Sequence, residues 1–399
     1  MSRIPVGVSG MGLVCSLGAG VGNVFERMCQ GACGIHPIDR FPVDSYAQKS
    51  GGQVPADVEA DLRGRFPDED FAAAMVKAAG DEALARAGAG STTAPDDRLG
   101  LVLATNFGPL ETLEWCWRER IDVDTIDPET FAAFDGFLEA GAAYFGCGGP
   151  RVQLSLSCAS GAGAIALAKD WIQAGRADRV LAIGYDALTE TCWCGLSNLR
   201  TISPDCVRPF DPARSGTIFG EGAAAMLLSG YAPGDQAPPP LAWVPGSATN
   251  NNAYHMTAPS KEAEGSRQVM ADALVDAELT PNDVEHICAH ATSTVANDVT
   301  EAAAFRNLFG DRLGSMTVSA HKSQIGHMMG GAGLAEAIVT VQILREGRIP
   351  PTLGHQELDP ACALDCVPGK PRSQEVSCAI TNSAGIGGNN ASVVLRAVS

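Results

Sequence analysis

The chain has 399 residues, of which 45% are hydrophobic and 19% charged, so it is long enough to bury two large hydrophobic cores. Its formal net charge of -18 opposes nucleic-acid binding, because phosphates would be repelled over most of the surface. No segment approaches the roughly 18 uncharged apolar residues that cross a bilayer, and the N-terminus lacks the charged and apolar regions of a signal peptide. We therefore expect a cytoplasmic protein that binds neither nucleic acid nor membranes.

Thirteen cysteines are spread along the chain, an odd number without the pattern of a disulfide framework. Close groupings such as Cys192 and Cys194 do not pair with a second cluster at the spacing of a zinc site. We therefore expect neither disulfides nor a bound metal.

Strand-like and helix-like segments alternate in the first half of the chain. Apolar runs with glycine breaks predict strands, and apolar residues at helical spacing predict helices. In chain order we predict a strand at Val6–Val14, a helix at Val21–Cys29, loops at 35–65, a helix at Phe71–Ala87, a strand at Leu99–Ala104, mixed helix and loop at 109–145, and strands at Val180–Ile183 and Ala224–Leu228.

The prolines and glycines of Gly230–Pro240 predict a linker, after which the same alternation begins again. The predicted elements are a strand at Leu241–Ala248, a helix at Ser266–Ala277, a strand at His286–Ala289, a helix at Asp298–Phe309, a strand at Met316–Ser319, a helix at Leu334–Leu344, and strands at Val376–Thr381 and Ser392–Ala397. Such alternation in two similar halves predicts an α/β fold with sheets between layers of helices. We place the two halves at residues 1–240 and 241–399.

Cys158 lies between a predicted strand and a predicted helix. Leu154 and Leu156 alternate with polar residues, and beyond Gly161 apolar residues recur at helical spacing until Gly175. A cysteine on such a turn points outward at the positive end of the helix dipole, which we expect to lower the pKa of its thiol. Cys158 is therefore the candidate nucleophile, although a lone cysteine is more often a small core residue.

Three further segments place polar residues at the ends of predicted strands, where α/β enzymes build their sites. In the first segment, His290 ends a strand, and Thr292 and Thr294 follow on the connecting loop. Asp298 and Glu301 lie three residues apart at the start of the next helix, so they share one face and suit its dipole. A histidine in such a place is more often structural, so the other segments decide its interpretation.

The second segment joins Lys322 and His327 to Glu336, which stands inside an otherwise apolar helix. A buried carboxylate needs a partner, and Lys322 is the natural candidate for an ion pair, unless Glu336 lies on a polar edge of the helix. The third segment, Thr381–Asn390, is a glycine-rich loop between two strands. Because phosphate-binding loops open a helix, this loop favours backbone donors for an oxyanion instead.

These segments and the Cys158 turn together resemble the β-ketoacyl-acyl-carrier-protein synthases of the elongating (type II) kind, including the type II polyketide ketosynthases of the thiolase superfamily. The order cysteine, histidine, lysine, histidine and the spacing of Lys322 to His327 match that family, and the resemblance covers essentially the whole chain. It extends to Pro5–Gly18, Arg208–Asp211, Phe219–Gly222 and Ala253–Thr257. The resemblance implies a thiolase-like fold of two similar halves with α-β-α-β-α layers, in a dimeric enzyme.

The resemblance also implies an acyltransferase that joins an acyl group to a malonyl unit and releases carbon dioxide. Cys158 would hold the acyl group, and its backbone N–H and that of Ile386 would form the oxyanion hole. His290 and His327 would bind the malonyl thioester and assist decarboxylation. The supporting roles are an ion pair of Lys322 with Glu336, loop support by Asp298 and Glu301, and contacts to a phosphopantetheine arm from Thr292, Thr294 and Thr257. No bound cofactor is implied, because an acyl carrier protein delivers that arm.

The chain departs from the family pattern near the acyl pocket. Elongating members usually carry two phenylalanines in the C-terminal loop, where this chain has Ala384 and Ile386, so we expect a wider pocket entrance. Phe107 and Trp193 fall in stretches that line the acyl pocket in the family, where a bulky ring at Phe107 would shorten the chain accepted.

The carrier-protein surface departs as well. The basic cluster of many relatives is reduced here to Arg63 and Arg65, with Arg200 as a further docking candidate. The net charge of -18 would repel an acidic carrier protein, so we expect a dedicated carrier or a basic partner subunit, in a homodimer or in a heterodimer with a chain-length-type subunit. These departures favour a specialised polyketide pathway over housekeeping fatty-acid synthesis.

Other interpretations meet specific obstacles. A degradative thiolase needs a second catalytic cysteine in the C-terminal glycine loop, and residues 382–390 contain none. A dinucleotide-binding fingerprint at Gly10 and Gly12 breaks at Cys15, where the third glycine should stand. A catalytically silent chain-length or partner subunit typically lacks the nucleophile, so Cys158 argues against this alternative but leaves it open. The remaining histidines, His36, His255, His286, His321 and His355, are expected to be surface or packing residues.

Overall fold

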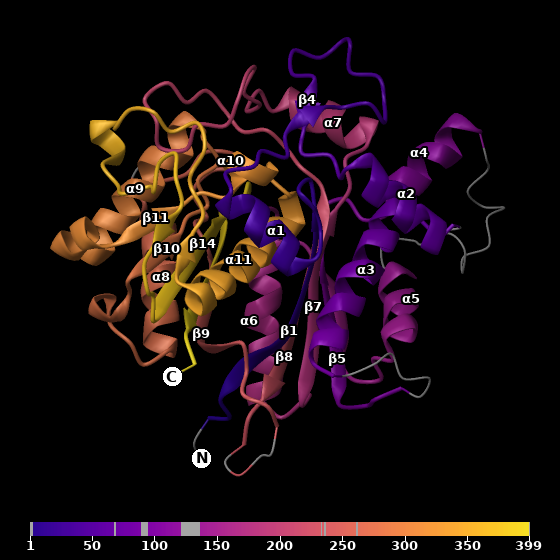
Figure 1. Ribbon diagram of the computed structural model, residues 1–399, viewed down its shortest axis with the longest axis horizontal. Coiled ribbons are helices and arrows are strands. Elements are labelled where there is room, and N and C mark those ends of the chain that lie inside the picture. The colour runs from indigo at the N-terminus through magenta and orange to yellow at the C-terminus, as the bar shows by residue number, and fades with distance from the viewer. Residues whose placement is uncertain are drawn as a thin grey trace.

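The computed structural model describes residues 3–67, 69–88, 95–120, 136–232, 234, 237–260 and 262–398. An 11-stranded sheet forms its framework (Figure 1). Its path runs through β11 (Thr317–Ser319), β10 (His286–Cys288), β14 (Cys378–Ala384), β15 (Asn389–Arg396), β9 (Ala242–Asn251), β1 (Val6–Cys15), β8 (Gly222–Gly230), β7 (Arg179–Asp186), β5 (Leu99–Ala104) and β6 (Arg151–Leu154), with β2 (Gly18–Ala19) beside β1.

The sheet consists of two halves with the same topology. Counted within each half in chain order, the strands follow the order 3-2-4-5-1, as β6-β5-β7-β8-β1 and as β11-β10-β14-β15-β9. The pairing directions also agree, because β5 and β10 each run parallel to both neighbours while the remaining pairs are antiparallel. The halves meet where β1 pairs with β9 at Gly7–Trp243 and Val8–Ala242.

Two helices, α6 (Ser160–Gln173) and α11 (Ala332–Glu346), lie between the two halves of the sheet (Figure 1). Both contact strands of both halves, and they also contact each other. Every residue of α11 from Ala332 to Leu344 is buried, as expected for a helix that is enclosed on all sides. Each of the two helices follows the third strand of its half. The N-terminal end of each helix therefore lies at the centre of the molecule.

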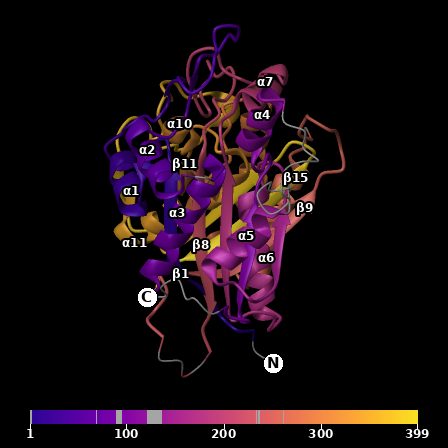
Figure 2. The ribbon, with the colours of Figure 1, turned by 90° about the vertical axis from the view of Figure 1, so that its right-hand side faces the viewer.

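Helices also cover the outer face of each half. In the first half α3 (Phe71–Arg86) packs on β1, β7 and β8, with α5 (Gly136–Phe145) beside it; Figure 2 shows this side. In the second half α8 (Glu264–Asp276) packs on β9 and β15, with α9 (Val295–Phe309) beside it. The fold thus has the five α-β-α-β-α layers of a thiolase-like protein, as predicted.

Smaller elements complete the described parts of the chain. They are the helices α1 (Val21–Cys29), α2 (Ala56–Arg65), α4 (Leu110–Arg118), α7 (Glu190–Asn198) and α10 (Lys322–Ile325), and the strand pairs β3 (His36–Pro37) with β4 (Ser50–Gly51) and β12 (Arg348–Ile349) with β13 (Arg372–Ser373). Among the helices of these described ranges, none is long and apolar enough to span a bilayer. All thirteen cysteines lie in described residues and are free thiols.

The long predicted elements agree with the structure to within a few residues, and α1 and β5 have the predicted bounds. The expected loop at 35–65 is wrong, because it contains α2, β3 and β4. Leu62 is the single buried residue of α2, so this helix has no apolar stripe that sequence could reveal. The short helix α7 was also not predicted. Of the expected segment 109–145, residues 121–135 lie outside the described residues, as do residues 233, 235 and 236 of the expected linker.

Candidate active site

Cys158 stands on a tight turn between β6 and α6. Ser157 has a positive φ of 53°, an unfavourable conformation for a residue with a side chain. Ser160 fixes the turn, because its Oγ donates to Ser157 O (2.6 Å) and accepts from Leu156 N (2.7 Å). The sequence prediction of a strand–turn–helix elbow is therefore confirmed.

The expected effect of this turn on the thiol is wrong. Burial raises the pKa of Cys158 to about 11, although Lys322 and the backbone N–H groups of Ile386 and Cys158 act in the opposite direction. The loss of solvent around the sulfur therefore outweighs the helix terminus. Cys158 is a neutral thiol at pH 7 in the free protein.

A glycine loop between β14 and β15 lies against this turn. The backbone N–H groups of Ile386 and Cys158 both donate toward the sulfur. Gly385 permits this approach, because a Cβ there would stand 2.8 Å from Leu156 O. The loop and the turn thus each contribute one backbone N–H beside the sulfur, close to where a carbonyl group bound to it would lie.

His290 is held by two carboxylates of α9. Glu301 accepts from the backbone N–H of His290 and of Ala291, both at 2.7 Å, and from Asn382 Nδ2 at 2.7 Å. Asp298 accepts from Ser293 N at 3.1 Å. Burial raises the pKa of Asp298 to about 7 and that of Glu301 in the same direction.

A buried ion pair lies behind His290. Lys322 Nζ contacts Glu336 Oε1 and lies 3.4 Å from His290 Nδ1. Because an ammonium group can only donate, His290 Nδ1 accepts and its ring proton is on Nε2. Burial raises the pKa of Glu336 to about 7, against the effect of Lys322.

His327 is held by the segment before β8 and by its own turn. Its N–H donates to Ile218 O (2.8 Å), and its carbonyl accepts from Gly220 N (2.9 Å). The Phe219 ring stacks on the imidazole with centroids 5.7 Å apart. Met329 N donates to His327 Nδ1 at 3.2 Å, so this ring also carries its proton on Nε2.

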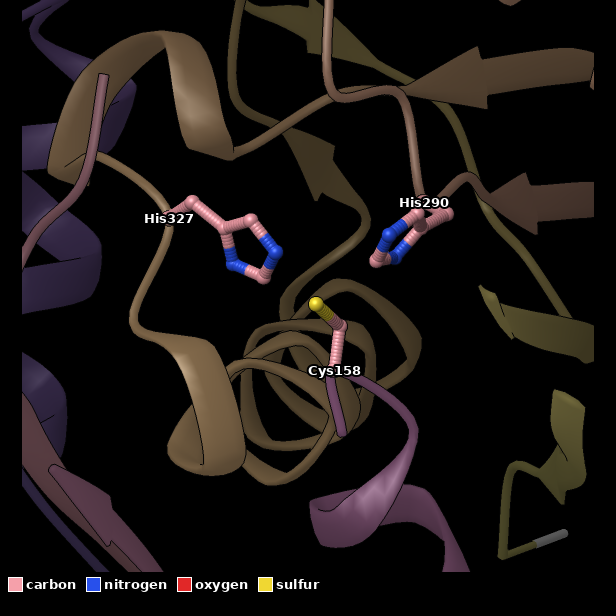
Figure 3. A group of neighbouring side chains, drawn as sticks. All are labelled: Cys158, His290 and His327. Carbon is pink, nitrogen blue, oxygen red and sulfur yellow. The ribbon is translucent and has the colours of Figure 1, made fainter. Parts of the chain in front are cut away.

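The two imidazole rings face the sulfur of Cys158 from two sides (Figure 3). Their centroids are 5.4 Å apart, and one atom each of Cys158, His290 and His327 lie within 4.8 Å of one another. Such closeness would suit a metal ion, but protons on both Nε2 atoms make the rings donors rather than metal ligands. Burial lowers the pKa of both histidines well below the usual value, so both are neutral. The site presents a thiol and two neutral N–H donors.

These groups line a cavity of about 280 Å³. It also contains the predicted arm-binding residues Thr292, Thr294 and Thr257, and the predicted gate residues Ala384 and Ile386. Thr292 and Thr294 are joined through their hydroxyls at 2.9 Å. The exposed His255 lines the cavity as well, and its Nδ1 accepts from the N–H groups of Thr257 and Ala258, each at 3.1 Å; we expected a surface or packing role only.

Phe107 and Trp193 do not line this cavity, and their place beside an acyl chain stays a prediction. Trp193 is fully buried, and Phe107 is half-buried against the same hydrophobic cluster. Phe219 belongs both to this cluster and to the cavity wall. Close packing behind Phe219 therefore separates both rings from the cavity.

Two of the three predicted docking arginines have partners within the chain. Arg63 pairs with Glu59 (2.8 Å) and Glu111 (2.5 Å), and Arg65 lies 3.7 Å from both Asp61 and Asp81. Both arginines therefore have carboxylate partners within the chain, and their role in docking stays a prediction.

Arg200 differs from that pair. Its side chain is exposed, and it lies between the cavity-lining residues Leu199 and Thr201. Among the described residues, Arg200 is thus the docking candidate that forms no ion pair with a carboxylate.

Sequence reasoning did not identify Asp186. This fully buried carboxylate accepts from Thr105 Oγ1 (2.6 Å), from the N–H groups of Asn106 and Phe107 (both 3.0 Å), and from Gly330 N (2.7 Å) in the turn after His327. Burial raises its pKa to about 6. A charged residue at the end of an apolar strand was the available signal.

Comparisons with known proteins place the chain in one family. Residues 4–233 match the N-terminal domain of beta-ketoacyl synthase, and residues 241–356 match its C-terminal domain. Nodulation protein E of Rhizobium leguminosarum bv. trifolii is 34% identical over 98% of both chains. The 3-oxoacyl-[acyl-carrier-protein] synthase 2 of Synechocystis sp. is 32% identical over 98% of this chain and 97% of its own. A solved structure, the ishigamide ketosynthase/chain length factor, is 29% identical over 100% of both chains, with a TM-score of 0.90.

The two domain matches together cover most of the chain, and the relatives match it over nearly its whole length. The chain therefore belongs to the β-ketoacyl synthase family, the acyltransferases that catalyse the condensing step of fatty-acid and polyketide elongation.

Proposed function

We propose that Cys158 is the acyl-accepting nucleophile and that His290 and His327 bind and decarboxylate a malonyl thioester. The observation that carries this proposal is the convergence of one atom from each of these residues within 4.8 Å in one cavity. In this proposal residues 1–240 supply the nucleophile and residues 241–399 supply the two histidines.

The first step is a thioester exchange at Cys158. Its sulfur attacks the acyl carbonyl, and the N–H groups of Cys158 and Ile386 stabilise the oxyanion that forms. The carbon–sulfur bond to the donor breaks, and the proton of Cys158 leaves with the released pantetheine thiol. The acyl group is then bound to Cys158.

The second step forms the carbon–carbon bond. The carboxylate of the malonyl thioester leaves as carbon dioxide, and the electron pair of the broken bond forms an enolate. Neutral His290 and His327 donate from Nε2 to the enolate oxygen as its charge develops. The enolate carbon attacks the acyl carbonyl, and the Cys158 thiolate leaves and recovers a proton.

We further propose that the substrates arrive on the phosphopantetheine arm of an acyl carrier protein. Thr292, Thr294 and Thr257 line the cavity and offer hydroxyls to the amides of such an arm. The relative in Synechocystis carries the acyl carrier protein in its name. Lys322 and Glu336 orient His290, and Asp298 and Glu301 fix its loop.

A specialised polyketide pathway agrees best with the cavity and the surface. Small Ala384 and partly exposed Ile386 flank the cavity entrance in place of two aromatic rings. Among the three docking candidates of the described chain, Arg200 is the one without an ion pair, which favours a dedicated carrier protein. β6 ends the path of the described sheet, so its outer edge can pair with a second copy or with a chain-length-type subunit.

Intact-protein mass tests the nucleophile. After exposure to acyl-pantetheine thioesters of increasing length, we expect one acyl adduct on the native chain and none on Cys158→Ala. An adduct that persists in Cys158→Ala, or no adduct with any donor, would contradict the proposal.

A further inference from the structure

A buried threonine whose hydroxyl has no partner stands in the wall of the substrate cavity. Thr217 is 3% exposed and lines the cavity together with Cys158 and His327. Its Oγ1 has no hydrogen-bond partner among the described residues. Leaving a buried hydroxyl unpaired is destabilising, and a position in a cavity wall allows a ligand to supply the missing partner.

The backbone fixes Thr217 in this wall. Its N–H donates to Thr201 O at 2.8 Å, and its carbonyl accepts from Ser203 N at 2.7 Å. Further along the same segment, Glu221 is anchored by the N–H groups of Val54 and Leu188, both at 2.8 Å. The backbone of the segment is therefore held in place at Thr217 and again at Glu221.

The same segment carries His327. Ile218, the next residue, accepts from His327 N, and Phe219 stacks on the imidazole. Residues two apart in an extended segment project to the same side, so Thr217 and Phe219 lie together on the cavity wall beside His327. His327 Nε2 also has no partner within the described chain.

Thr217 and His327 each place an unpaired polar group in the cavity wall, and a malonyl unit has two oxygen functions that need partners. A malonyl thioester carries a carbonyl and a carboxylate, separated by a single carbon. We propose that Thr217 binds the extender carboxylate through its hydroxyl while His327 Nε2 binds the thioester carbonyl. This inference rests on the proposed function and adds the residue that recognises the carboxylate.

This placement has a kinetic consequence. The hydroxyl donates to the carboxylate while it is charged, and the interaction weakens as the carboxylate becomes carbon dioxide. An interaction stronger in the bound substrate than in the transition state lowers KM without raising kcat. Removal of the hydroxyl should therefore raise KM for the malonyl thioester and leave kcat equal or higher.

Thr217→Val and Thr217→Ser test the inference with malonyl-pantetheine as substrate and carbon dioxide release as readout. Loss of a hydrogen bond to a charged group predicts about a ten-fold or larger rise of KM in Thr217→Val, and Thr217→Ser should restore it. Thr352→Val is the matched control, because Thr352 is another buried threonine with an unpaired Oγ1 and does not line the cavity. Its KM should equal that of the native protein.

A second measurement, the rate at which acyl-pantetheine loads Cys158, distinguishes a hydroxyl that binds the malonyl carboxylate from one that contacts the acyl chain. Intact-protein mass gives this rate. An unchanged loading rate in Thr217→Val beside the raised malonyl KM supports the assignment. An unchanged malonyl KM would overturn it, as would a slower loading with unchanged KM, which would place the hydroxyl against the acyl chain. Native protein that releases no carbon dioxide from malonyl-pantetheine would contradict both this inference and the proposed function.

Discussion

Burial, more than local charge, sets the chemistry of single residues at this site. It raises the pKa of Cys158 to about 11 and lowers the pKa of His290 and His327 well below the usual value. Neutral imidazoles remain hydrogen-bond donors over the working pH range. The thiol, by contrast, becomes a nucleophile through the small fraction of thiolate present at each pH.

The rate of Cys158 alkylation should therefore rise steeply with pH. A folded pKa of about 11 predicts that the thiolate fraction, and with it the rate with iodoacetamide, grows about ten-fold for each unit between pH 7 and 10. Peptide mass after short exposures measures this rate, with exposed Cys33 in the same sample as a reference for the reagent. A rate of Cys158 that is constant from pH 7 to 9 would show that the thiolate is already formed at neutral pH.

The identities of Cys158, His290, Lys322 and His327 could be predicted because each stands in a short local pattern. The pKa of Cys158 could not, since the helix terminus and burial act in opposite directions and only the fold shows which is larger. Thr217 could not be predicted either. Its proposed role depends on the contact between its own segment and the segment of His327, which lies more than 100 residues away in the sequence.

At the scale of elements, the site depends on the close crossing of α6 and α11. A Cβ on Gly161 would stand 2.6 Å from Leu334 N, and a Cβ on Gly333 would stand 2.6 Å from Ala162 N. Each glycine thus allows its own helix to approach the backbone of the helix from the other half of the fold. Their helices begin beside Cys158 and beside the turn of His327, so the crossing sets the distance between these residues.

Gly161→Ala should destabilise the protein by about 1–3 kcal/mol, because the added methyl group forces the two helix backbones apart. Urea unfolding measures the change. Gly64→Ala in α2 is the matched control: nothing lies within 4 Å of its Cβ, so helix propensity alone predicts stabilisation by about 0.5–1 kcal/mol. Equal stability of native protein and Gly161→Ala would show that the crossing tolerates a wider separation.

Long elements with a clear apolar period could be predicted from the sequence, as α1, β5 and the enclosed helix α11 show. α2 could not, because it buries a single residue and has no period to read. The sequence also did not show that Phe107 and Trp193 pack in one hydrophobic cluster with Phe219, because these residues are far apart along the chain.

At the scale of the whole molecule, charge limits where a carrier protein can bind. The net charge of -18 repels an acidic partner, and both Arg63 and Arg65 are paired within the chain. Arg200 is exposed and lies between two residues that line the cavity. The repetition of one half-fold brings the cysteine of one half and the histidines of the other into this same cavity.

Reversal of the Arg200 charge should slow acyl transfer to Cys158 from a carrier protein but not from a small donor. Arg200→Glu is expected to lower Cys158 loading from an acyl-carrier protein several-fold at low salt, with a smaller effect at high salt. Loading from acyl-pantetheine should be unchanged. Arg396→Glu makes the same charge change at the far end of β15 from the glycine loop and should behave as the native protein. Equal loading of Arg200→Glu and Arg396→Glu would place docking elsewhere.

Single-turnover condensation tests the central claim most directly. Enzyme loaded with one acyl group is mixed with malonyl-pantetheine, and mass measures both the adduct on the protein and the released product. We predict a β-ketoacyl-pantetheine two carbons longer from native protein, no loading of Cys158→Ala, and loading without product in His327→Ala. Product formed by Cys158→Ala, or normal product from His327→Ala, would contradict the assignment of the nucleophile or of the decarboxylating histidine.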